Sequence, residues 1–203
     1  MEDQSNEELM RLFQAGETQA FELLVQRIER PLYFYILRLI GDEEQAKDIL
    51  QEALLKVIRS VQRYDGKSKV KSWIYTISRN VCIDQLRKRK NRMISLDQPV
   101  GSESYTLLSM ISDEGPDGLE LSARQEIINR ITEALDTISK DQREVFILRE
   151  IQGYKFIEIA EILSCSENTV KSRMRYALQA LRSELYEYRT LVQKSEESKN
   201  ESA

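Results

Sequence analysis

One stretch of the chain, residues 156–174, reads FIEIAEILSCSENTVKSRM. Its first half predicts a short helix that packs through Ile159 and Leu163, which lie one turn apart. A tight turn follows, and Ser166 is placed to cap the next helix. Two short helices joined in this way are typical of a helix-turn-helix, whose second helix enters the major groove of DNA. An ordinary antiparallel helix pair is the alternative on this pattern alone.

The second helix of this motif carries the candidate residues for reading duplex DNA. Val170 occupies its core position, so the polar and basic side chains around it remain available outside. Such side chains contact phosphates and the edges of bases. The candidates are Thr169, Lys171, Ser172, Arg173 and Arg175.

Helices are expected through most of the remaining chain. Its 203 residues include only seven Gly and three Pro, whereas sheet proteins of this size use more turn residues. Apolar side chains recur at helical spacing in four segments before residue 90, which are separated at Gly16, Gly41 and 64–70. A second helical set is expected at 121–135, in a segment capped by Ser139, at 155–163 and from Glu167 onward.

The prediction is an all-α protein of two small helical domains joined by a flexible acidic linker. The linker is expected where Pro, Gly, Ser and acidic residues replace the helical pattern. Residues 93–136 hold nine acidic and two basic side chains. The expected boundaries are 5–92 for the first domain, 93–120 for the linker, 121–189 for the second domain and 190–203 for a disordered tail.

The composition excludes several classes of function. The chain has no histidine, and its two cysteines are far apart in sequence. Zinc sites, disulfide scaffolds and catalytic Ser-His or Cys-His pairs are therefore not expected. The longest apolar run, 31–40, is too short to span a bilayer, and the acidic N-terminal residues are unlike a signal peptide. We expect a cytoplasmic protein with no metal, cofactor, catalytic residue or membrane insertion.

A basic segment with interleaved aromatic residues precedes the linker. Residues 59–92 hold 11 basic and two acidic side chains, although the whole chain has a net charge of −4. Trp73 and Asn80 lie on a predicted helix that ends in Arg87 and Lys88. Aromatic and amide groups can hold unstacked bases while Lys and Arg neutralise phosphates. A core tryptophan and a solvated run of charges at a helix end are the alternative.

A third segment, residues 42–57, reads DEEQAKDILQEALLKV. Four of its side chains fall on adjoining positions of one helix, while Ile49 and Ala53 turn inward. These four are Asp48, Gln51, Glu52 and Leu55. A paired-carboxylate enzyme could use such groups, but no metal ligand or nucleophile accompanies them. A solvated helix face is the plain alternative.

In their order, spacing and amino-acid sequence, the three segments resemble the extracytoplasmic-function (ECF) sigma factors, which form group 4 of the sigma-70 family. These proteins retain only regions 2 and 4 of larger sigma factors. The resemblance covers about residues 5–188. It implies a subunit that binds core RNA polymerase and directs promoter-specific initiation by reading the −35 and −10 elements and melting the −10 region. It also implies an anti-sigma factor as a partner, besides core polymerase and promoter DNA.

The resemblance assigns roles to residues at matching positions. Asp48, Gln51, Glu52 and Leu55 fall on the region 2 surface that docks on the β′ clamp helices, and a further contact is implied with the β flap. The −10 residues are Tyr64, Lys67, Lys69, Lys71 and Trp73 around a base-capturing loop, and Asn80, Asp84, Arg87 and Lys88 on the helix that reads and melts the duplex. The −35 residues are Thr169, Lys171, Ser172, Arg173, Arg175 and Tyr176.

Four sites depart from the family pattern. Val70 replaces a larger aromatic residue beside the base-capturing loop, and Ser164 occupies a turn position where glycine is common. Ser139 stands where proline is usual, and its cap does a comparable job. Arg175 precedes Tyr176, where an aromatic or His followed by Arg is common, which leaves the −35 sequence preference open.

A free-standing helix-turn-helix regulator with a helical sensor domain is the competing interpretation. It explains residues 137–189 but leaves the basic segment 59–92 without a role. Such regulators normally dimerise on palindromic sites, and no second hydrophobic stripe in the sequence indicates a dimer interface. Binding to core RNA polymerase would separate the two hypotheses.

Overall fold

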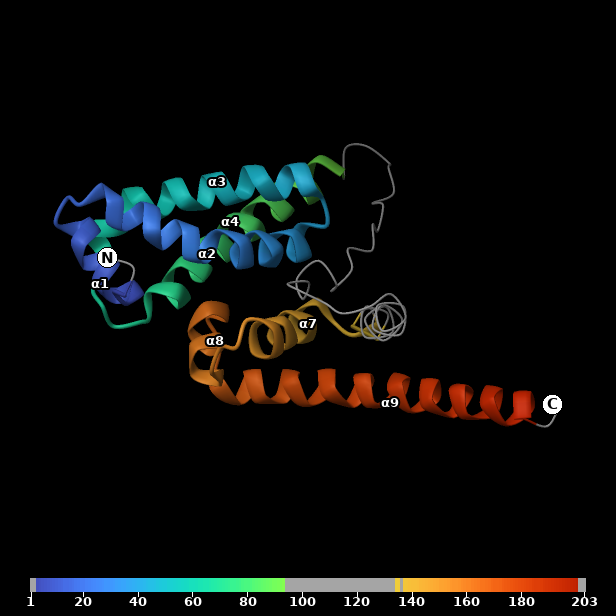
Figure 1. The fold of residues 1–203 in the computed structure, drawn as a ribbon. Coiled ribbons are helices and arrows are strands. Elements are labelled where there is room, and N and C mark those ends of the chain that lie inside the picture. Colours follow the sequence, from blue (N-terminus) through green and yellow to red (C-terminus); the bar gives the residue numbers. More distant parts are fainter. Residues whose placement is uncertain (1–2, 94–133, 136, 201–203) are drawn as a thin grey trace. The chain divides into compact units, whose positions relative to one another are not determined.

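The computed structural model describes residues 3–93, 134–135 and 137–200 (Figure 1). Within these ranges the regular structure is helical and contains no strand, so the all-α prediction is confirmed. None of the described helices is both long and apolar enough to cross a membrane. The predicted linker and nearly all of the predicted helix at 121–135 lie outside the described residues.

The helices belong to two compact units. The first unit holds α1 to α4, the 3-10 turn η1 and α8, and the second holds α7, the π-helical turn η2 and almost all of α9. The sequence predicts that α8 belongs to the second domain. In the structure α8 packs against α4 of the first unit.

Helix α1 (Asn6–Gln14) begins at a capping box formed by Ser5 and Glu8. The Ser5 hydroxyl accepts a hydrogen bond from the Glu8 N–H at 3.2 Å, and Glu8 Oε2 accepts one from the Ser5 N–H at 2.7 Å. The hydrogen bond from the Ser5 backbone lowers the pKa of Glu8. The backbone N–H groups of Ser5 and Glu8, which have no carbonyl partner within the helix, are thus both hydrogen-bonded. This stabilises the start of α1.

Helices α2 (Thr18–Ile40) and α3 (Glu43–Ser60) pack against each other in the first unit. Gly41 ends α2 in a left-handed conformation, with φ at 75°, which glycine adopts without a steric penalty. Asp42 Oδ1 then accepts a hydrogen bond from the Gln45 N–H at 2.8 Å and so caps α3.

The apolar residues that recur at helical spacing along α3 are divided between core and surface. The buried members of this set are Ala46, Ile49, Leu50, Ala53 and Val57. Leu54 is only half-buried and Ile58 is 40% exposed, so these two members of the set reach the surface. They lie one helical turn apart, on a face of α3 that its neighbours do not fully cover.

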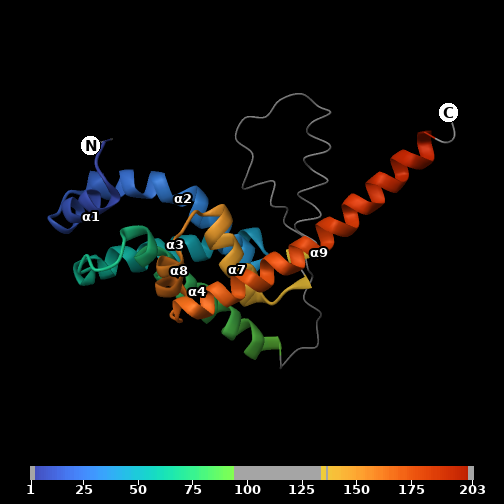
Figure 2. The ribbon, with the colours of Figure 1, turned by 90° about the horizontal axis from the view of Figure 1, so that it is seen from below.

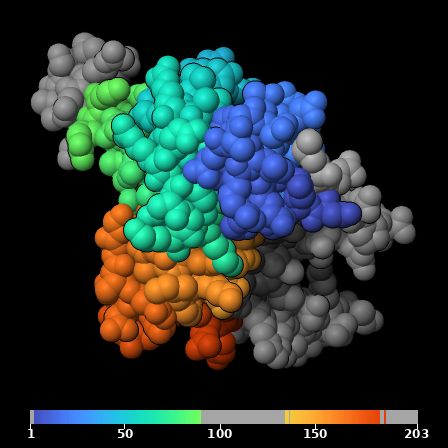
Figure 3. Space-filling model, turned by 90° about the vertical axis from the view of Figure 1, so that its left-hand side faces the viewer, coloured from blue at the N-terminus to red at the C-terminus, as the bar shows by residue number. Residues whose placement is uncertain are grey.

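The turn η1 (Val61–Arg63) and a short loop lead into α4 (Val70–Met93). The side-chain amide of Gln14 ties this segment to α1, since its Nε2 donates to the carbonyl oxygens of Val61 and Tyr64, both at 2.9 Å. Figure 3 shows the turquoise surface of this segment next to α1 in dark blue. The start of the loop is therefore tied to α1 of the first unit.

Helix α7 (Lys140–Phe146) of the second unit starts at the predicted Ser139 cap. Ser139 Oγ accepts from the Gln142 N–H at 3.3 Å, and Gln142 Oε1 accepts from the Ser139 N–H at 3.1 Å. The chain then continues directly into η2 (Ile147–Ile151). A core cluster of this unit comprises Ala134, Leu135 and Leu181, with Ile138, Phe146 and Ile151 packed against it.

Helices α8 (Phe156–Leu163) and α9 (Glu167–Asn200) occupy the predicted helix-turn-helix segment. Ser164 ends α8 with φ at 52°, a left-handed conformation that costs a non-glycine residue about 1–2 kcal/mol. Helix α9 runs without a break through residues 190–200, where the sequence predicts disorder (Figure 2). No Gly or Pro follows Gly153, so no residue of low helix propensity interrupts α9.

Candidate polymerase and nucleic-acid interfaces

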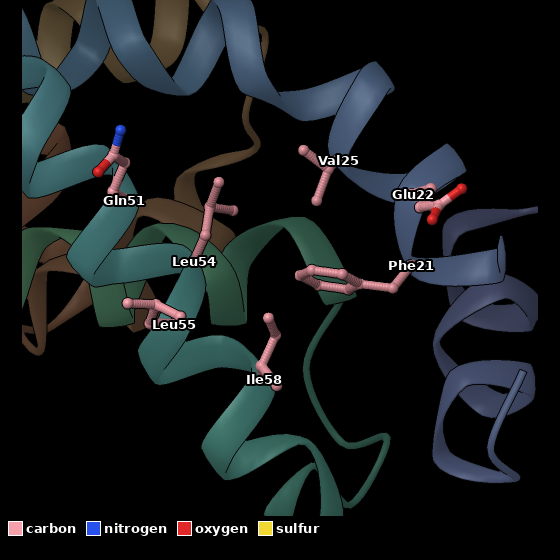
Figure 4. Close-up of a pocket in the computed structure, with 7 residues that line it drawn as sticks. All are labelled: Phe21, Glu22, Val25, Gln51, Leu54, Leu55 and Ile58. Atoms are coloured by element: carbon pink, nitrogen blue, oxygen red, sulfur yellow. The ribbon is translucent and has the colours of Figure 1, made fainter. Parts of the chain in front are cut away.

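An apolar groove of about 510 Å³ lies between α2 and α3 (Figure 4). The residues that line it are Phe21, Glu22, Val25, Gln51, Leu54, Leu55 and Ile58. Phe21 and Val25 project from α2 toward Leu54 and Ile58 of α3. Leu55 lies at its edge and is 50% exposed. Exposed apolar side chains gathered in one place are typical of protein-binding surfaces.

This groove includes part of the predicted polymerase-binding set. Gln51 and Leu55 line it, while Asp48 is exposed and Glu52 half-buried on the same helix. Sequence reasoning placed the remaining apolar lining residues at helical spacing and did not single them out as a surface. Helical periodicity marks these positions as apolar, but it cannot show which of them the neighbouring helices leave exposed.

Glu52 has a second role, because it joins α3 to α4. Its carboxylate accepts hydrogen bonds from Lys56 Nζ at 3.1 Å and from Gln85 Nε2 at 3.2 Å. The hydrogen bond from Lys56 lowers the pKa of Glu52. A charge reversal at Glu52 would therefore break an internal contact as well as alter the surface. Leu55 offers the cleaner test of docking.

The aromatic residues of the predicted base-capturing loop pack on each other. Tyr64 is buried, and its hydroxyl donates to the Ser68 carbonyl at 2.6 Å. Its ring lies against Trp73 with 5.2 Å between centroids, and burial raises the pKa of Tyr64. Val70 is fully buried, whereas Trp73 is half-buried and keeps part of its surface accessible. Tyr64 therefore supports the loop from within.

The three lysines of this segment are exposed and differ in their partners. Lys67 Nζ lies 2.8 Å from the Asp65 carboxylate, and Lys69 Nζ lies 2.6 Å from Glu158 Oε1 on α8. These hydrogen bonds raise the pKa of both ammonium groups. Lys71 is exposed in the first turn of α4. Each of these two ammonium groups keeps exposed N–H donors beside its carboxylate partner.

The predicted strand-opening residues share one face of α4. They are Asn80, Asp84, Arg87 and Lys88, and all four are exposed. Successive intervals of four, three and one residues place them along the same side of a helix. Val81 and Cys82 turn the other way and are buried. A polar and basic stripe therefore faces solvent, as phosphate binding requires.

The first turns of α9 separate into a buried and an outer face. Val170, Met174 and Ala177 are buried. The predicted −35 residues comprise Lys171, Ser172, Arg175 and Tyr176, which are exposed, and Thr169 and Arg173, which are half-buried.

The two arginines of this set have different surroundings. The Arg173 guanidinium forms an ion pair with Asp141 of α7, so it is already engaged inside the second unit. The Arg175 guanidinium lies 5.4 Å from the centroid of the Tyr176 ring. Stacking of this kind limits the conformations of a long side chain. Arg175 is therefore the exposed arginine of the two, with its guanidinium beside the neighbouring ring.

Family comparisons account for both parts of the chain. The sigma-70 region 2 model matches residues 24–92, and the sigma-70 region 4 model matches residues 128–181. The ECF RNA polymerase sigma factor SigX of Bacillus subtilis is 33% identical over 165 residues, covering 81% of this chain and 82% of SigX. The chain belongs to the ECF RNA polymerase sigma factors.

Further comparisons agree with this assignment of the sigma factor. SigW of Bacillus subtilis is 30% identical over 170 residues, covering 84% of this chain and 91% of SigW. The structure is also similar to the sigma factor RpoE of Bartonella quintana, which was solved in complex with the anti-sigma factor NepR. The two share a TM-score of 0.66 and 26% identity, and the match covers 82% of this chain and 96% of RpoE. CnrH, solved with the cytosolic domain of CnrY, has the same fold at a TM-score of 0.62 and 20% identity, covering 89% of this chain and 96% of CnrH.

The resemblance drawn from the sequence is thereby confirmed, and the chain functions as an RNA polymerase sigma factor. The free-standing regulator is not favoured. That alternative left the basic segment 59–92 without a role, whereas the region 2 match ends at residue 92 and includes that segment in full.

Proposed function

We propose that this sigma factor docks on core RNA polymerase through the groove between α2 and α3, reads the −10 region with α4 and its preceding loop, and reads the −35 element with the first turns of α9. The docking proposal rests mainly on Leu55, which is half exposed at the edge of an apolar groove. The DNA proposals rest on the exposed stripes of α4 and α9.

The β′ clamp helices are the polymerase element that the family resemblance implies for this groove. A helix that lays apolar side chains into a groove is a common mode of protein recognition. Glu22 in the groove and Asp48 nearby on α3 would favour basic side chains beside those apolar contacts. Region 4 would add the second contact, on the β flap.

Promoter opening depends on binding free energy and breaks no covalent bond, so we propose a non-enzymatic subunit that needs no cofactor. Flipping a base out of the duplex costs a few kcal/mol. Stacking a base on the accessible part of Trp73 would contribute about 1–3 kcal/mol. Phosphate contacts to Lys67, Lys71 and Arg87 would add salt-dependent binding. The amide of the exposed Asn80 would hydrogen-bond to the edge of an unpaired base.

Replacing Arg87 and Lys88 together with alanine should flatten the salt dependence of promoter binding. Each lost phosphate contact lowers the log–log slope by about 0.9 for duplex DNA, so two lost contacts lower it by about 1.8. Holoenzyme affinity for a promoter fragment, measured across about 50–200 mM salt, reports this slope. Lys47→Ala removes an exposed cation from α3 and should leave the slope unchanged. An unaltered slope in the double variant would show that Arg87 and Lys88 are only solvated.

We further propose that an anti-sigma factor regulates this protein in the cytoplasm. The support is the similarity to RpoE of Bartonella quintana, which was solved with the anti-sigma factor NepR. An anti-sigma factor that covered the groove between α2 and α3 would compete with core polymerase for the same apolar side chains. Such competition would prevent holoenzyme assembly without any change to the DNA-reading helices.

Transcription with purified components tests the proposed function. Core polymerase is incubated with genomic fragments, with and without the full-length chain, and the RNA 5′ ends are sequenced. We expect new start sites that appear only with the chain and share two upstream motifs. Duplex DNA binding by the chain alone, without any effect on core polymerase, would instead support the regulator hypothesis.

A further inference from the structure

The end of helix α1 holds the segment that leads into the proposed base-capturing loop. The side-chain amide of Gln14 has two N–H donors, and they reach the carbonyl oxygens of Val61 and Tyr64, both at 2.9 Å. In return, Gln62 Nε2 donates to the backbone carbonyl of Gln14 at 3.2 Å. These three hydrogen bonds fasten the turn η1 to α1 at the point where the loop begins.

The start of α1 holds the other end of the loop. Val70, the first residue of α4, is fully buried, so its N–H requires a protein acceptor. The first N–H groups of a helix have no carbonyl partner within that helix. Glu7 Oε1 accepts this hydrogen bond at 3.3 Å, from 63 residues earlier in the chain. A carboxylate is also favourable there, because the N-terminus of a helix carries a partial positive charge.

The spacing of these two side chains limits the span of the loop. Glu7 and Gln14 are seven residues apart, so they share one face of α1 and lie about 10 Å apart along its axis. The chain from Tyr64 to Val70 would reach about 20 Å if it were extended. The loop is bowed instead, and Gly66 with φ at 75° provides a turn within it. The side chains on either side of Gly66 are exposed.

Helix α1 is itself fixed on the first unit. Leu9 and Met10 are fully buried. Arg27 of α2 holds the start of α1, since its Nη1 donates to the Gln4 carbonyl at 2.6 Å and to Asn6 Oδ1 at 3.3 Å. The region 2 match begins at residue 24, so α1 precedes the matched residues. The loop is therefore anchored, at both of its ends, to a well-packed helix that lies ahead of the matched domain.

We propose that α1 acts as a rigid support for the base-capturing loop, with Glu7 and Gln14 as positioning residues that set the shape of the loop for −10 recognition. The proposal rests on the proposed function of this loop in −10 binding. A loop that is already held in its binding conformation loses less conformational entropy when it takes up a base. Glu7 and Gln14 act on −10 recognition through the loop and need no contact with DNA.

Gln14→Glu tests the support at the start of the loop with almost no change in side-chain size. The ionised carboxylate has no N–H donor and would face two carbonyl oxygens. Each lost hydrogen bond changes an equilibrium about two- to tenfold, so we expect the holoenzyme to bind a pre-melted promoter about five- to thirtyfold more weakly. Gln45→Glu adds the same charge at an exposed position of α3 and should bind this promoter as the native chain does.

Glu7 offers a test with a conservative variant at the other end of the loop. The side-chain oxygen of Glu7→Gln can still accept from the Val70 N–H, whereas Glu7→Ala leaves this buried N–H without its acceptor. We expect Glu7→Ala to weaken binding of the pre-melted promoter about two- to tenfold, and Glu7→Gln to stay within about twofold of the native chain. Equal losses in the two variants would show that the carboxylate acts by its charge, which would overturn its role as an anchor of the loop.

The fluorescence of Trp73 reports on the loop in the free chain. Trp73 is the only tryptophan of the sequence, and its ring lies 5.2 Å from that of Tyr64 between centroids. A loosened loop should expose this ring, so acrylamide should quench Gln14→Glu and Glu7→Ala more strongly than the native chain and Gln45→Glu. Circular dichroism checks that each variant remains as helical as the native chain. Native quenching in folded Gln14→Glu and Glu7→Ala would show that α1 does not shape the loop.

An abasic scan tests whether the support acts through base capture. Each non-template base of the −10 region is removed in turn, in a pre-melted promoter found by the transcription experiment, and the affinities of native and Gln14→Glu holoenzymes are measured. Removing the captured base should weaken the native holoenzyme several-fold and have little further effect on Gln14→Glu, because both changes remove the same interaction. The full additional loss in Gln14→Glu would overturn the positioning role while leaving base capture intact. If no position affects the native holoenzyme, the proposed base capture is wrong and the positioning role is wrong with it.

Discussion

Leu55→Glu is expected to weaken the affinity for core RNA polymerase by about 30-fold or more. Burying a leucine side chain contributes about 1.5–3 kcal/mol, and a carboxylate in the same contact would also lose hydration. Because Leu55 is half exposed in the free protein, its replacement should leave the fold intact. Fluorescence anisotropy of the labelled chain, titrated with core polymerase, measures the change.

Two further variants make this result specific to the groove. Ile58→Glu, on the same face of α3, should have a similar effect because Ile58 lines the groove. Gln45→Glu adds the same charge at an exposed position of α3 outside the groove and should bind core polymerase normally. Native affinity in a folded Leu55→Glu protein would place the polymerase contact elsewhere on the sigma factor.

Arg175→Ala is expected to relax the −35 preference at one or two base pairs. A bidentate arginine–guanine contact contributes about 1–3 kcal/mol of discrimination, which corresponds to roughly a 5- to 150-fold difference between bases. Arg175 is exposed, and the Tyr176 ring restricts its guanidinium. Competitive transcription from a set of promoters with single −35 substitutions would measure the preference.

Asn80→Ala provides the matched comparison on α4. It should leave the −35 preference unchanged and impair strand opening, seen as lost permanganate reactivity of thymines near the start site. A template with a pre-melted bubble should partly restore its activity, because the free energy of opening has already been supplied. The same template should not restore Arg175→Ala. An equal response of both variants would contradict the division between reading and melting.

Features set by neighbours within one or two helical turns could be predicted from the sequence. The caps at Ser5, Asp42 and Ser139 involve partners three residues away, so a short window contains both members of each hydrogen bond. The common face of Asn80, Asp84, Arg87 and Lys88 follows from the helical repeat. The family resemblance rested on the same local patterns, and the comparisons confirmed it.

The tertiary structure decided which of these local patterns remain available to partners. Periodicity places Ile58 on the apolar side of α3, but it cannot show how far α2 covers α3. A tyrosine in a polar loop looks exposed in sequence, yet Tyr64 packs on Trp73. Lys69 and Glu158 are 89 residues apart, and no spacing rule joins side chains so distant. Such pairs form only when separate helices meet, so only the structure could show that α8 lies against α4.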